Sequence, residues 1–358
     1  IYYEQIAESY ILNGGYITAE KYIENALYYV EKYNLEYRKA KIIYLRAKIC
    51  KAKEEYTLAQ QFFLSSNVIF IKNNNYEEIV NTFLNLGKIT LEQNAFHSAS
   101  SYLRQAEKVY LDNNIGDDFL LGEIYYYMAQ AYFNIEDMTN AMNYSFLAKS
   151  KFEQVRNREE YAKTLLLLSK EYNKQGDLAN AIKYSQKTLE VYKELDELHN
   201  ISEIENNLGK LFYEFENIEE SFKHYEISKN IRIRRNDSKV VNTLMNICEN
   251  YIKLKDISKC EEILIEISSF LDEGDIENLI ELNLLWYRIY ILKELLKEAE
   301  YVLLDTYDLA KKNNLQKQAG QLSIMIGKFY IDNKKEVEAA KYLDEGVNIF
   351  RKLGILKN

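Results

Sequence analysis

Small and apolar residues recur along the chain in a unit of about 40 residues. We take as anchors the small residues Ala19, Ala59, Ala99, Ala141, Ala181, Ser221, Cys260, Ala299 and Ala339. Successive anchors are separated by 40, 40, 42, 40, 40, 39, 39 and 40 residues. Other positions are numbered by their distance before the anchor, so that Ala7 stands at position −12. A chain with this period is expected to be an array of equal structural units.

Three further positions keep one kind of side chain across the repeats. Position −12 is small in eight of nine repeats and −13 is apolar in eight of nine. Position −9 is aromatic in seven: Tyr10, Tyr132, Tyr172, Phe212, Tyr251, Tyr290 and Tyr330. Two helices that pack closely need small residues where their axes approach. Each repeat is therefore predicted to be a helical hairpin, whose aromatic residue fills the gap to the next hairpin.

Composition and turn residues support an all-helical chain. The 358 residues contain no Pro and only 12 Gly, the two residues that helix interiors tolerate least. Polar stretches rich in Asn separate the helical segments, and in the clearest unit Gly176 is expected in a left-handed conformation and Asp177 as the cap of the next helix. The predicted fold class is all-α, a right-handed superhelical solenoid of about nine hairpins, eighteen helices and no strand.

Charge and cysteine usage narrow the class of partner and compartment. The net charge is −9, which disfavours direct binding to nucleic acid. No apolar run reaches the length needed to cross a membrane. Cys50, Cys248 and Cys260 form no CxxC motif or paired framework, which favours a reducing, cytoplasmic location. Cys248 and Cys260 stand at the two small positions of one hairpin, and we expect them to face each other as core thiols, with a disulfide as the alternative.

No catalytic or cofactor motif is present in the sequence. The three histidines, His97, His199 and His224, lie outside the packing positions and form no metal-binding motif such as HExxH. Gly14-Gly15 is interpreted as a turn between two helices rather than a phosphate loop. We therefore expect a binding protein without cofactor or metal, and not an enzyme.

The small residue at −12, the aromatic residue three positions later, the Gly-Asp turn and the anchoring Ala together resemble the tetratricopeptide repeat. The unit of about 40 residues is longer than the common unit of 34, and it is similar to that of the peptide-sensing RRNPP family, the Rap, NprR, PlcR and PrgX regulators of Gram-positive bacteria. The resemblance implies a cytosolic quorum-sensing transcriptional regulator that binds a short linear signalling peptide in a concave groove. Groove asparagines hold the main chain of the peptide in that family.

A second face of the first helix in each repeat fits such a groove. Positions −18, −14, −11 and −7 share one helical face, about half a turn from the packing positions. Position −11 is basic in six of nine repeats, and Asn recurs at −14. This pattern favours an extended peptide that is acidic or held by its carboxylate, although a solvated face would give the same pattern. The predicted peptide-binding residues are Asn85, Lys88, Tyr126, Tyr127, Gln130, Lys170, Asn206, Asn207, Lys210, Asn242 and Asn246.

Residues 1–358 are expected to form a single repeat domain. In regulators of the PlcR and NprR kind a helix-turn-helix precedes the repeats, and we expect DNA binding only through such a module, outside this chain. Two other hypotheses stay open: a Rap-like response-regulator phosphatase or antagonist, for which we expect a helical bundle ahead of the repeats, and a protein–protein scaffold without a small ligand. The last helix, around residues 336–352, has an apolar face that predicts a homodimer through the C-terminal repeats.

Overall fold

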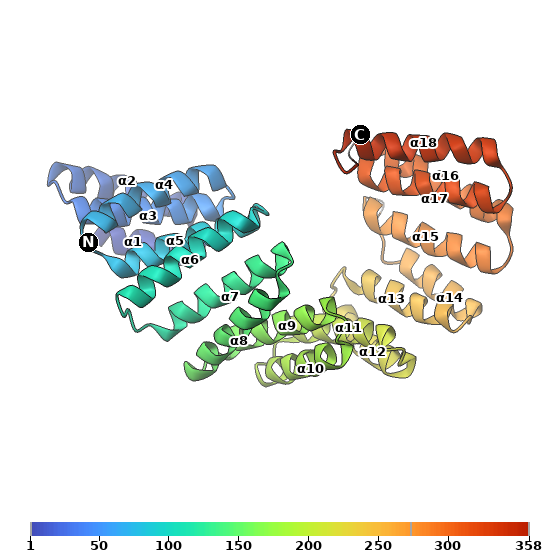
Figure 1. The fold of residues 1–358 in the computed structure, drawn as a ribbon, viewed down its shortest axis with the longest axis horizontal. Helices are drawn as coiled ribbons and strands as arrows, with labels where there is room; N and C mark the ends of the chain where they lie inside the picture. Colours follow the sequence, from blue (N-terminus) through green and yellow to red (C-terminus); the bar gives the residue numbers. More distant parts are fainter. Residues whose placement is uncertain (1, 273, 357–358) are drawn as a thin grey trace. The chain divides into compact units, whose positions relative to one another are not determined.

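The computed structural model describes residues 2–272 and 274–356, and within them the chain forms eighteen α-helices and no strand (Figure 1). The described residues fall into two compact units, residues 1–191 and 192–358, with the boundary inside α10. The helices are α1 (Tyr2–Leu12), α2 (Tyr16–Lys32), α3 (Glu36–Ala52), α4 (Tyr56–Lys72), α5 (Tyr76–Glu92), α6 (Phe96–Asp112), α7 (Asp118–Ile135), α8 (Met138–Gln154), α9 (Arg158–Lys174), α10 (Leu178–Glu194), α11 (Leu198–Glu214), α12 (Ile218–Arg234), α13 (Val240–Lys253), α14 (Ile257–Ser268), α15 (Ile276–Leu292), α16 (Leu296–Lys312), α17 (Gln316–Asp332) and α18 (Glu336–Lys352). This confirms the all-α fold class and the hairpin repeat.

The small positions lie where the two helices of a hairpin meet. All nine anchors are buried, as are the small residues at −12. Gly87, Gly209 and Gly327 show why the position is restricted, because a Cβ atom there would lie 2.5–2.6 Å from the side chain of Leu103, Tyr225 or Leu343 respectively. Each of those larger residues stands four positions after the anchor, one helical turn along the facing helix. A glycine on one helix therefore makes room for a bulky residue on the other.

The aromatic residue at −9 packs differently from our expectation. In five of the seven repeats it packs on the ring three positions after the anchor in the same hairpin, as in Tyr132 on Tyr144 and Tyr172 on Tyr184, with ring centroids 5.6 and 5.3 Å apart. The prediction that it fills the gap to the next hairpin was wrong for these repeats. In the sixth repeat a histidine takes the partner position, and His224 stacks on Phe212 at 5.2 Å. His224 is thus part of the packing, contrary to the sequence interpretation.

The turns between helices use a left-handed residue nearly every 20 positions. Among the described residues, Gly14, Gly116, Gly176 and, after the last helix, Gly354 have positive φ, and fourteen residues other than glycine, most of them Asn or Glu, adopt the same conformation. The Asp177 carboxylate accepts a hydrogen bond from the backbone N–H of Asn180 at 3.1 Å. Both predictions for the Gly176-Asp177 turn are confirmed. Across the described residues, no helix combines the length and apolarity needed to span a bilayer.

Candidate functional site

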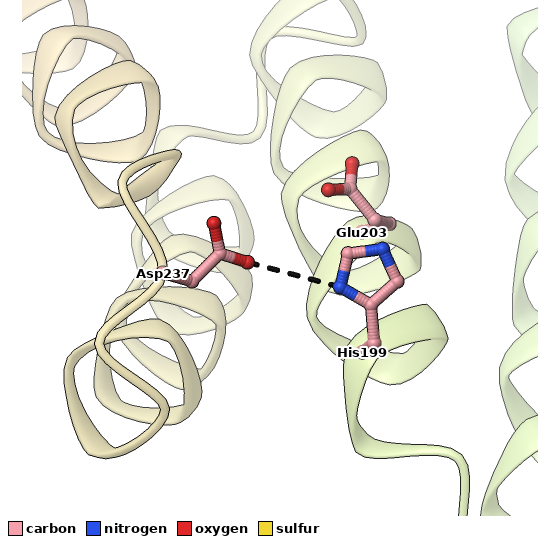
Figure 2. A group of neighbouring side chains, drawn as sticks. All are labelled: His199, Glu203 and Asp237. Carbon is pink, nitrogen blue, oxygen red and sulfur yellow. Dashed lines mark ion pairs between the residues drawn. The ribbon is translucent and has the colours of Figure 1, made fainter.

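One histidine belongs to a group with possible metal-ligand chemistry that the sequence analysis did not find. His199, Glu203 and Asp237 in residues 192–358 bring a ring nitrogen and two carboxylates within 4.8 Å of one another (Figure 2). The Nδ1 atom of His199 lies 3.8 Å from Oδ2 of Asp237. His199 and Glu203 are one turn apart on α11, whereas Asp237 precedes α13, so only the tertiary fold unites them.

Two cations already occupy the surroundings of Glu203. Its Oε1 atom lies 3.0 Å from Nη2 of Arg232 and 2.9 Å from Nζ of Lys239. Burial raises the pKa of Glu203, but the Lys239 hydrogen bond and the Arg232 charge outweigh it and hold the pKa below its ordinary value. The buried Arg232 also donates to the Lys239 carbonyl and to Thr243 Oγ1, at 2.8 and 2.6 Å. The group is an ion-pair network that fixes α12 against α13, and its positive charges oppose a bound cation.

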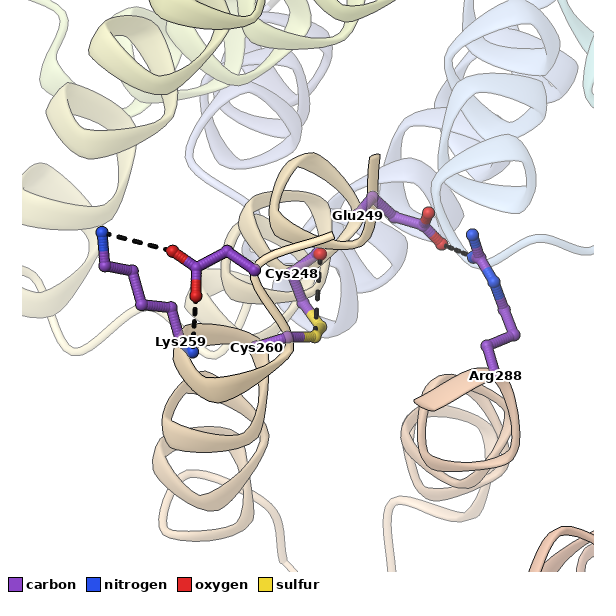
Figure 3. The surroundings of a disulfide bond; sticks show 6 residues. Cys248, Glu249, Lys259, Cys260 and Arg288 are labelled. Atoms are coloured by element: carbon purple, nitrogen blue, oxygen red, sulfur yellow. Dashed lines mark hydrogen bonds and ion pairs between the residues drawn. A yellow bond between two sulfur atoms is a disulfide. The ribbon is translucent and has the colours of Figure 1, made fainter. Parts of the chain in front are cut away.

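The two cysteines at the small positions of the seventh hairpin face each other, as predicted, but not as thiols. Cys248 of α13 and Cys260 of α14 are joined by a disulfide, with their Cα atoms 5.0 Å apart (Figure 3). Both are fully buried, and Cys50 is a free, buried thiol. The expectation of two core thiols was therefore wrong. A small residue at both positions brings the backbones close enough for the bond.

In residues 1–191, part of the predicted peptide-binding face is already engaged. Lys88 forms an ion pair with Glu123 at 2.7 Å, and its ammonium lies 4.6 Å from the ring centroid of Tyr127. Asn85 donates its amide N–H groups to the Tyr44 hydroxyl and the Asn81 carbonyl, at 2.9 and 2.8 Å. Glu123 stands at −18 of the next repeat, on α7. Its carboxylate therefore neutralises the lysine at −11 on α5.

Two other predicted residues of this unit, Gln130 and Lys170, have side chains available to a ligand. Within the described part of the chain, the side chains of Gln130 and Lys170 form no hydrogen bond or ion pair. Lys170 is exposed and Gln130 half-buried. Tyr126 and Tyr127 stand next to each other on α7, with ring centroids 5.2 Å apart in an edge-on arrangement. Burial raises the pKa of Tyr127 well above its usual range, so its hydroxyl stays protonated and able to donate.

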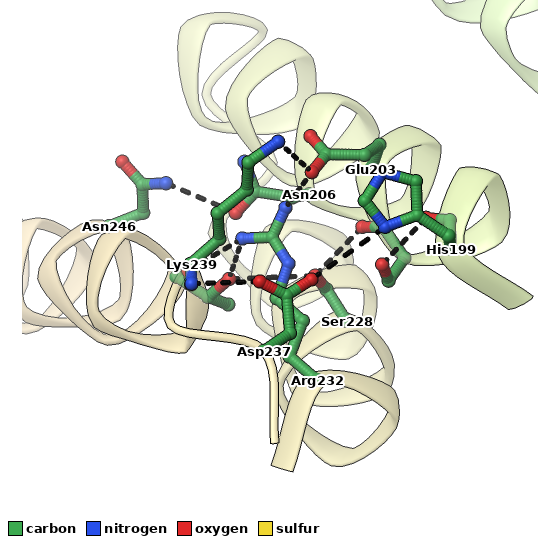
Figure 4. Close-up of polar contacts among 10 residues, drawn as sticks. His199, Glu203, Asn206, Ser228, Arg232, Asp237, Lys239 and Asn246 are labelled. Carbon is green, nitrogen blue, oxygen red and sulfur yellow. Dashed lines mark hydrogen bonds and ion pairs between the residues drawn. The ribbon is translucent and has the colours of Figure 1, made fainter. Parts of the chain in front are cut away.

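In residues 192–358, α11 and α13 bring predicted asparagines together. Asn246 of α13 donates its amide N–H to Oδ1 of Asn206 on α11 at 3.2 Å (Figure 4). Asn207, Lys210 and Asn242 have side chains without a partner among the residues described, and Lys210 and Asn242 are exposed. The pair leaves both amide N–H groups of Asn206, and one N–H group and the oxygen of Asn246, without a partner among the described residues. Five of the predicted residues thus lie on α11 and α13, of which Asn206 is buried and the other four are at least partly exposed.

The sequence analysis missed acidic residues on the same face. Glu123, Glu203 and Glu281 all stand at −18, and the first two take part in the ion pairs above. At −11, Arg288 pairs with Glu249 of the preceding repeat. The six basic residues at −11 therefore do not form an uninterrupted positive ladder. Reading position −18 together with −11 would have shown from the sequence that this face also carries acidic residues, but not which basic residues they pair with.

Two buried carboxyl groups lie apart from the face. Glu171 of α9 is fully buried, accepts a hydrogen bond from Ser145 Oγ at 2.7 Å, and has no partner for Oε2. Burial raises the pKa of Glu171 to about 7, against the opposing effect of the Ser145 hydrogen bond. Glu205 of α11 is also buried, and its Oε2 atom lies 2.6 Å from Nδ1 of His224. Position −10, where Glu171 stands, is apolar in six of the nine repeats, which would have marked this residue in the sequence.

Comparisons with known proteins agree with this repeat architecture. Residues 160–234 match the tetratricopeptide repeat family. Residues 160–234 thus carry tetratricopeptide repeats. The fold of the chain is similar to the apo form of RapI, with a TM-score of 0.74 and 14% identity over 98% of this chain and 97% of that one. A comparison with curated protein sequences finds no match.

Two further solved structures share the fold. The apo form of the quorum sensor NprR from B. thuringiensis has a TM-score of 0.66 and 14% identity, covering 97% of each chain. A Rap protein complexed with Competence and Sporulation Factor has a TM-score of 0.53 and 16% identity, covering 98% of this chain and 97% of that one. The fold thus resembles that of RRNPP-family proteins. At these identities the likeness concerns the fold alone.

Proposed function

We propose that this protein binds a short linear peptide and acts as the sensor of a cytosolic quorum-sensing transcriptional regulator. The observation that carries the proposal is the polar cluster of α11 and α13: the Asn206–Asn246 amide pair beside the uncommitted Asn207, Lys210 and Asn242. These side chains project from neighbouring first helices of one compact unit.

The chemistry of the cluster suits the main chain of an extended peptide. Such a chain presents N–H and C=O groups in alternation, and an asparagine can both donate and accept. An N–H group of Asn206 and the oxygen of Asn246 together complement one peptide unit, whatever its side chain. Lys210 adds a positive charge without an internal partner, which suits an acidic residue or the carboxylate end of the peptide.

The size of the ligand follows from the spacing of the first helices. An extended peptide advances about 3.3 Å per residue, so seven residues span about 23 Å. Packed helices lie about 8–10 Å apart, and such a peptide crosses two to three first helices. The unit of residues 192–358 can therefore hold it alone. We propose Gln130, Lys170, Tyr126 and Tyr127 as contacts of a ligand on the other unit.

The similar proteins support a regulatory role. NprR is a quorum sensor, and a Rap protein is complexed with Competence and Sporulation Factor. We propose DNA binding only through a module outside this chain. A Rap-like response-regulator antagonist is the second candidate, because the likeness to RapI extends over 97% of that chain. We expected a Rap-like protein to have a helical bundle ahead of the repeats. Because the likeness covers nearly all of the RapI chain, that expectation does not favour the transcriptional regulator over the Rap-like antagonist.

The test compares Asn207→Ala and Lys210→Ala with wild type. Heptapeptides selected on the wild-type protein from a random library are titrated calorimetrically, each with a free and an amidated C-terminus. Asn207→Ala should lose about 1–3 kcal/mol of binding free energy, since it leaves a peptide polar group unpaired. Lys210→Ala should weaken the free-carboxylate form more than the amidated form, and more at low salt than at high salt.

Matched controls come from exposed residues away from this face. Asn348→Ala on α18 and Lys297→Ala on α16 remove the same side-chain types and should leave affinity unchanged. Helix content by circular dichroism is measured for every variant. If all four variants bind the selected peptides as wild type does, the first-helix face is only a solvated surface and the proposal fails.

A further inference from the structure

The first-helix face changes character toward its C-terminal end, within residues 192–358. Position −14 is Asn207 in the sixth repeat and Asn246 in the seventh. In the eighth and ninth repeats positions −15 and −14 are both apolar, as Leu284-Leu285 and Ile324-Met325. Two cavities lie here. One of about 510 Å³ is lined by α15, α17 and Phe350 of α18, and one of about 380 Å³ by α13, α15 and Met325.

The two cavities form one continuous groove, because both are lined by Glu281, Leu284 and Met325. We call it the C-terminal groove. Its apolar surface includes Ile280, Leu284, Leu285, Leu322, Met325 and Phe350. An apolar surface of this kind favours a ligand that covers it with apolar side chains.

The charged residues of the groove are predominantly acidic. Glu277 and Glu281 stand one turn apart on α15, are exposed, and have no hydrogen bond or ion pair within residues 2–272 and 274–356. The other two charged lining residues, Glu249 and Arg288, form an ion pair with each other. Two carboxylates thus remain uncompensated beside the apolar surface, and a cationic group complements them.

We propose that the C-terminal groove binds a peptide segment of about five or six residues whose apolar side chains flank one lysine or arginine. The cation would lie at Glu277 and Glu281, and the apolar side chains against Leu284 and Met325. The inference rests on the proposed function, since both place a peptide on the first-helix face. It assigns the opposite charge preference to this end, with Lys210 drawing a carboxylate and Glu281 drawing a cation.

The experiment uses two defined probes, the pentapeptide Leu-Ile-Lys-Phe-Leu, acetylated and amidated, and its copy with Glu in place of Lys. Both are titrated calorimetrically into the full chain at low and at high salt. Wild type should bind the Lys probe at least tenfold more tightly than the Glu probe. Glu281→Gln should reduce that ratio about fivefold, with the larger effect at low salt. Met325→Asp should abolish binding of both probes.

Glu298→Gln is the matched control, because Glu298 is exposed on α16 and does not line the groove. If Met325→Asp loses helix content, Glu281→Gln still decides the question. Equal affinity for the two probes, or a Lys-to-Glu ratio unchanged in Glu281→Gln, overturns the inference. If the Lys210 variant loses heptapeptide binding and wild type does not bind the Lys probe, the proposed function stands. Only the inference about the C-terminal groove then fails. If instead the Lys probe binds in a manner that depends on Glu281, while the Asn207 and Lys210 variants bind the heptapeptides as wild type does, the C-terminal groove stands and the proposed function fails.

Discussion

Replacing Glu171 by Gln should remove a specific part of the pH dependence of stability. The side chain is fully buried in residues 1–191, where Ser145 Oγ donates to Oε1 and Oε2 has no partner. Burial raises its pKa to about 7 from an ordinary value of 4.5. The folded protein therefore holds a proton on Glu171 between pH 4.5 and 7 that the unfolded chain has released.

The sign of the effect follows from proton linkage. Because the folded state binds more protons in this range, stability from this group is complete below pH 4.5 and is lost as the pH rises through about 7. With these two pKa values, the free energy of unfolding falls by about 2.5 kcal/mol between pH 5 and pH 8. Glutamine is neutral throughout and keeps an oxygen for Ser145, so Glu171→Gln should not show this loss.

The assay is urea unfolding followed by circular dichroism at pH 5 and pH 8. Subtracting the unfolding free energy of wild type from that of Glu171→Gln at each pH cancels the contributions of the other titrating groups. This difference should grow by about 2.5 kcal/mol in favour of the variant from pH 5 to pH 8. Glu153→Gln, on the exposed surface of α8, is the control and should show no such change. A difference for Glu171→Gln that is constant within about 0.5 kcal/mol would refute the assignment of a protonated carboxyl in this core.

Three further predictions concern packing, cysteine chemistry and assembly. Gly209→Ala should cost about 1–3 kcal/mol in urea unfolding, because its Cβ atom would lie 2.5 Å from the Tyr225 ring; stability equal to wild type would show that the hairpin can relax. Denatured without reductant, the protein should show one reactive thiol, Cys50, by chromogenic titration, and three thiols would exclude the Cys248–Cys260 bond. Sedimentation at micromolar concentration should show a homodimer formed through the C-terminal repeats, as predicted from the apolar face of α18, and a monomer with or without peptide would contradict it.

The repeat and the all-helical class follow from the sequence alone. The anchor is small in all nine repeats, position −12 is small in eight and position −9 is aromatic in seven, and proline is absent. These are local signals, and local signals suffice for helices and hairpins. The Gly176-Asp177 turn was predictable for the same reason, since the left-handed residue and the cap lie within a few positions of each other.

The partners of individual side chains required the tertiary structure. Lys88 meets Glu123, Arg232 meets Glu203, and Asn246 meets Asn206 across separate helices, and no single helix contains both members of these pairs. The sequence has a basic residue at −11 in six repeats but does not show which of them are neutralised. That depends on the facing helix, because these two ion pairs are set by distances of a few ångströms between residues 29 and 35 positions apart.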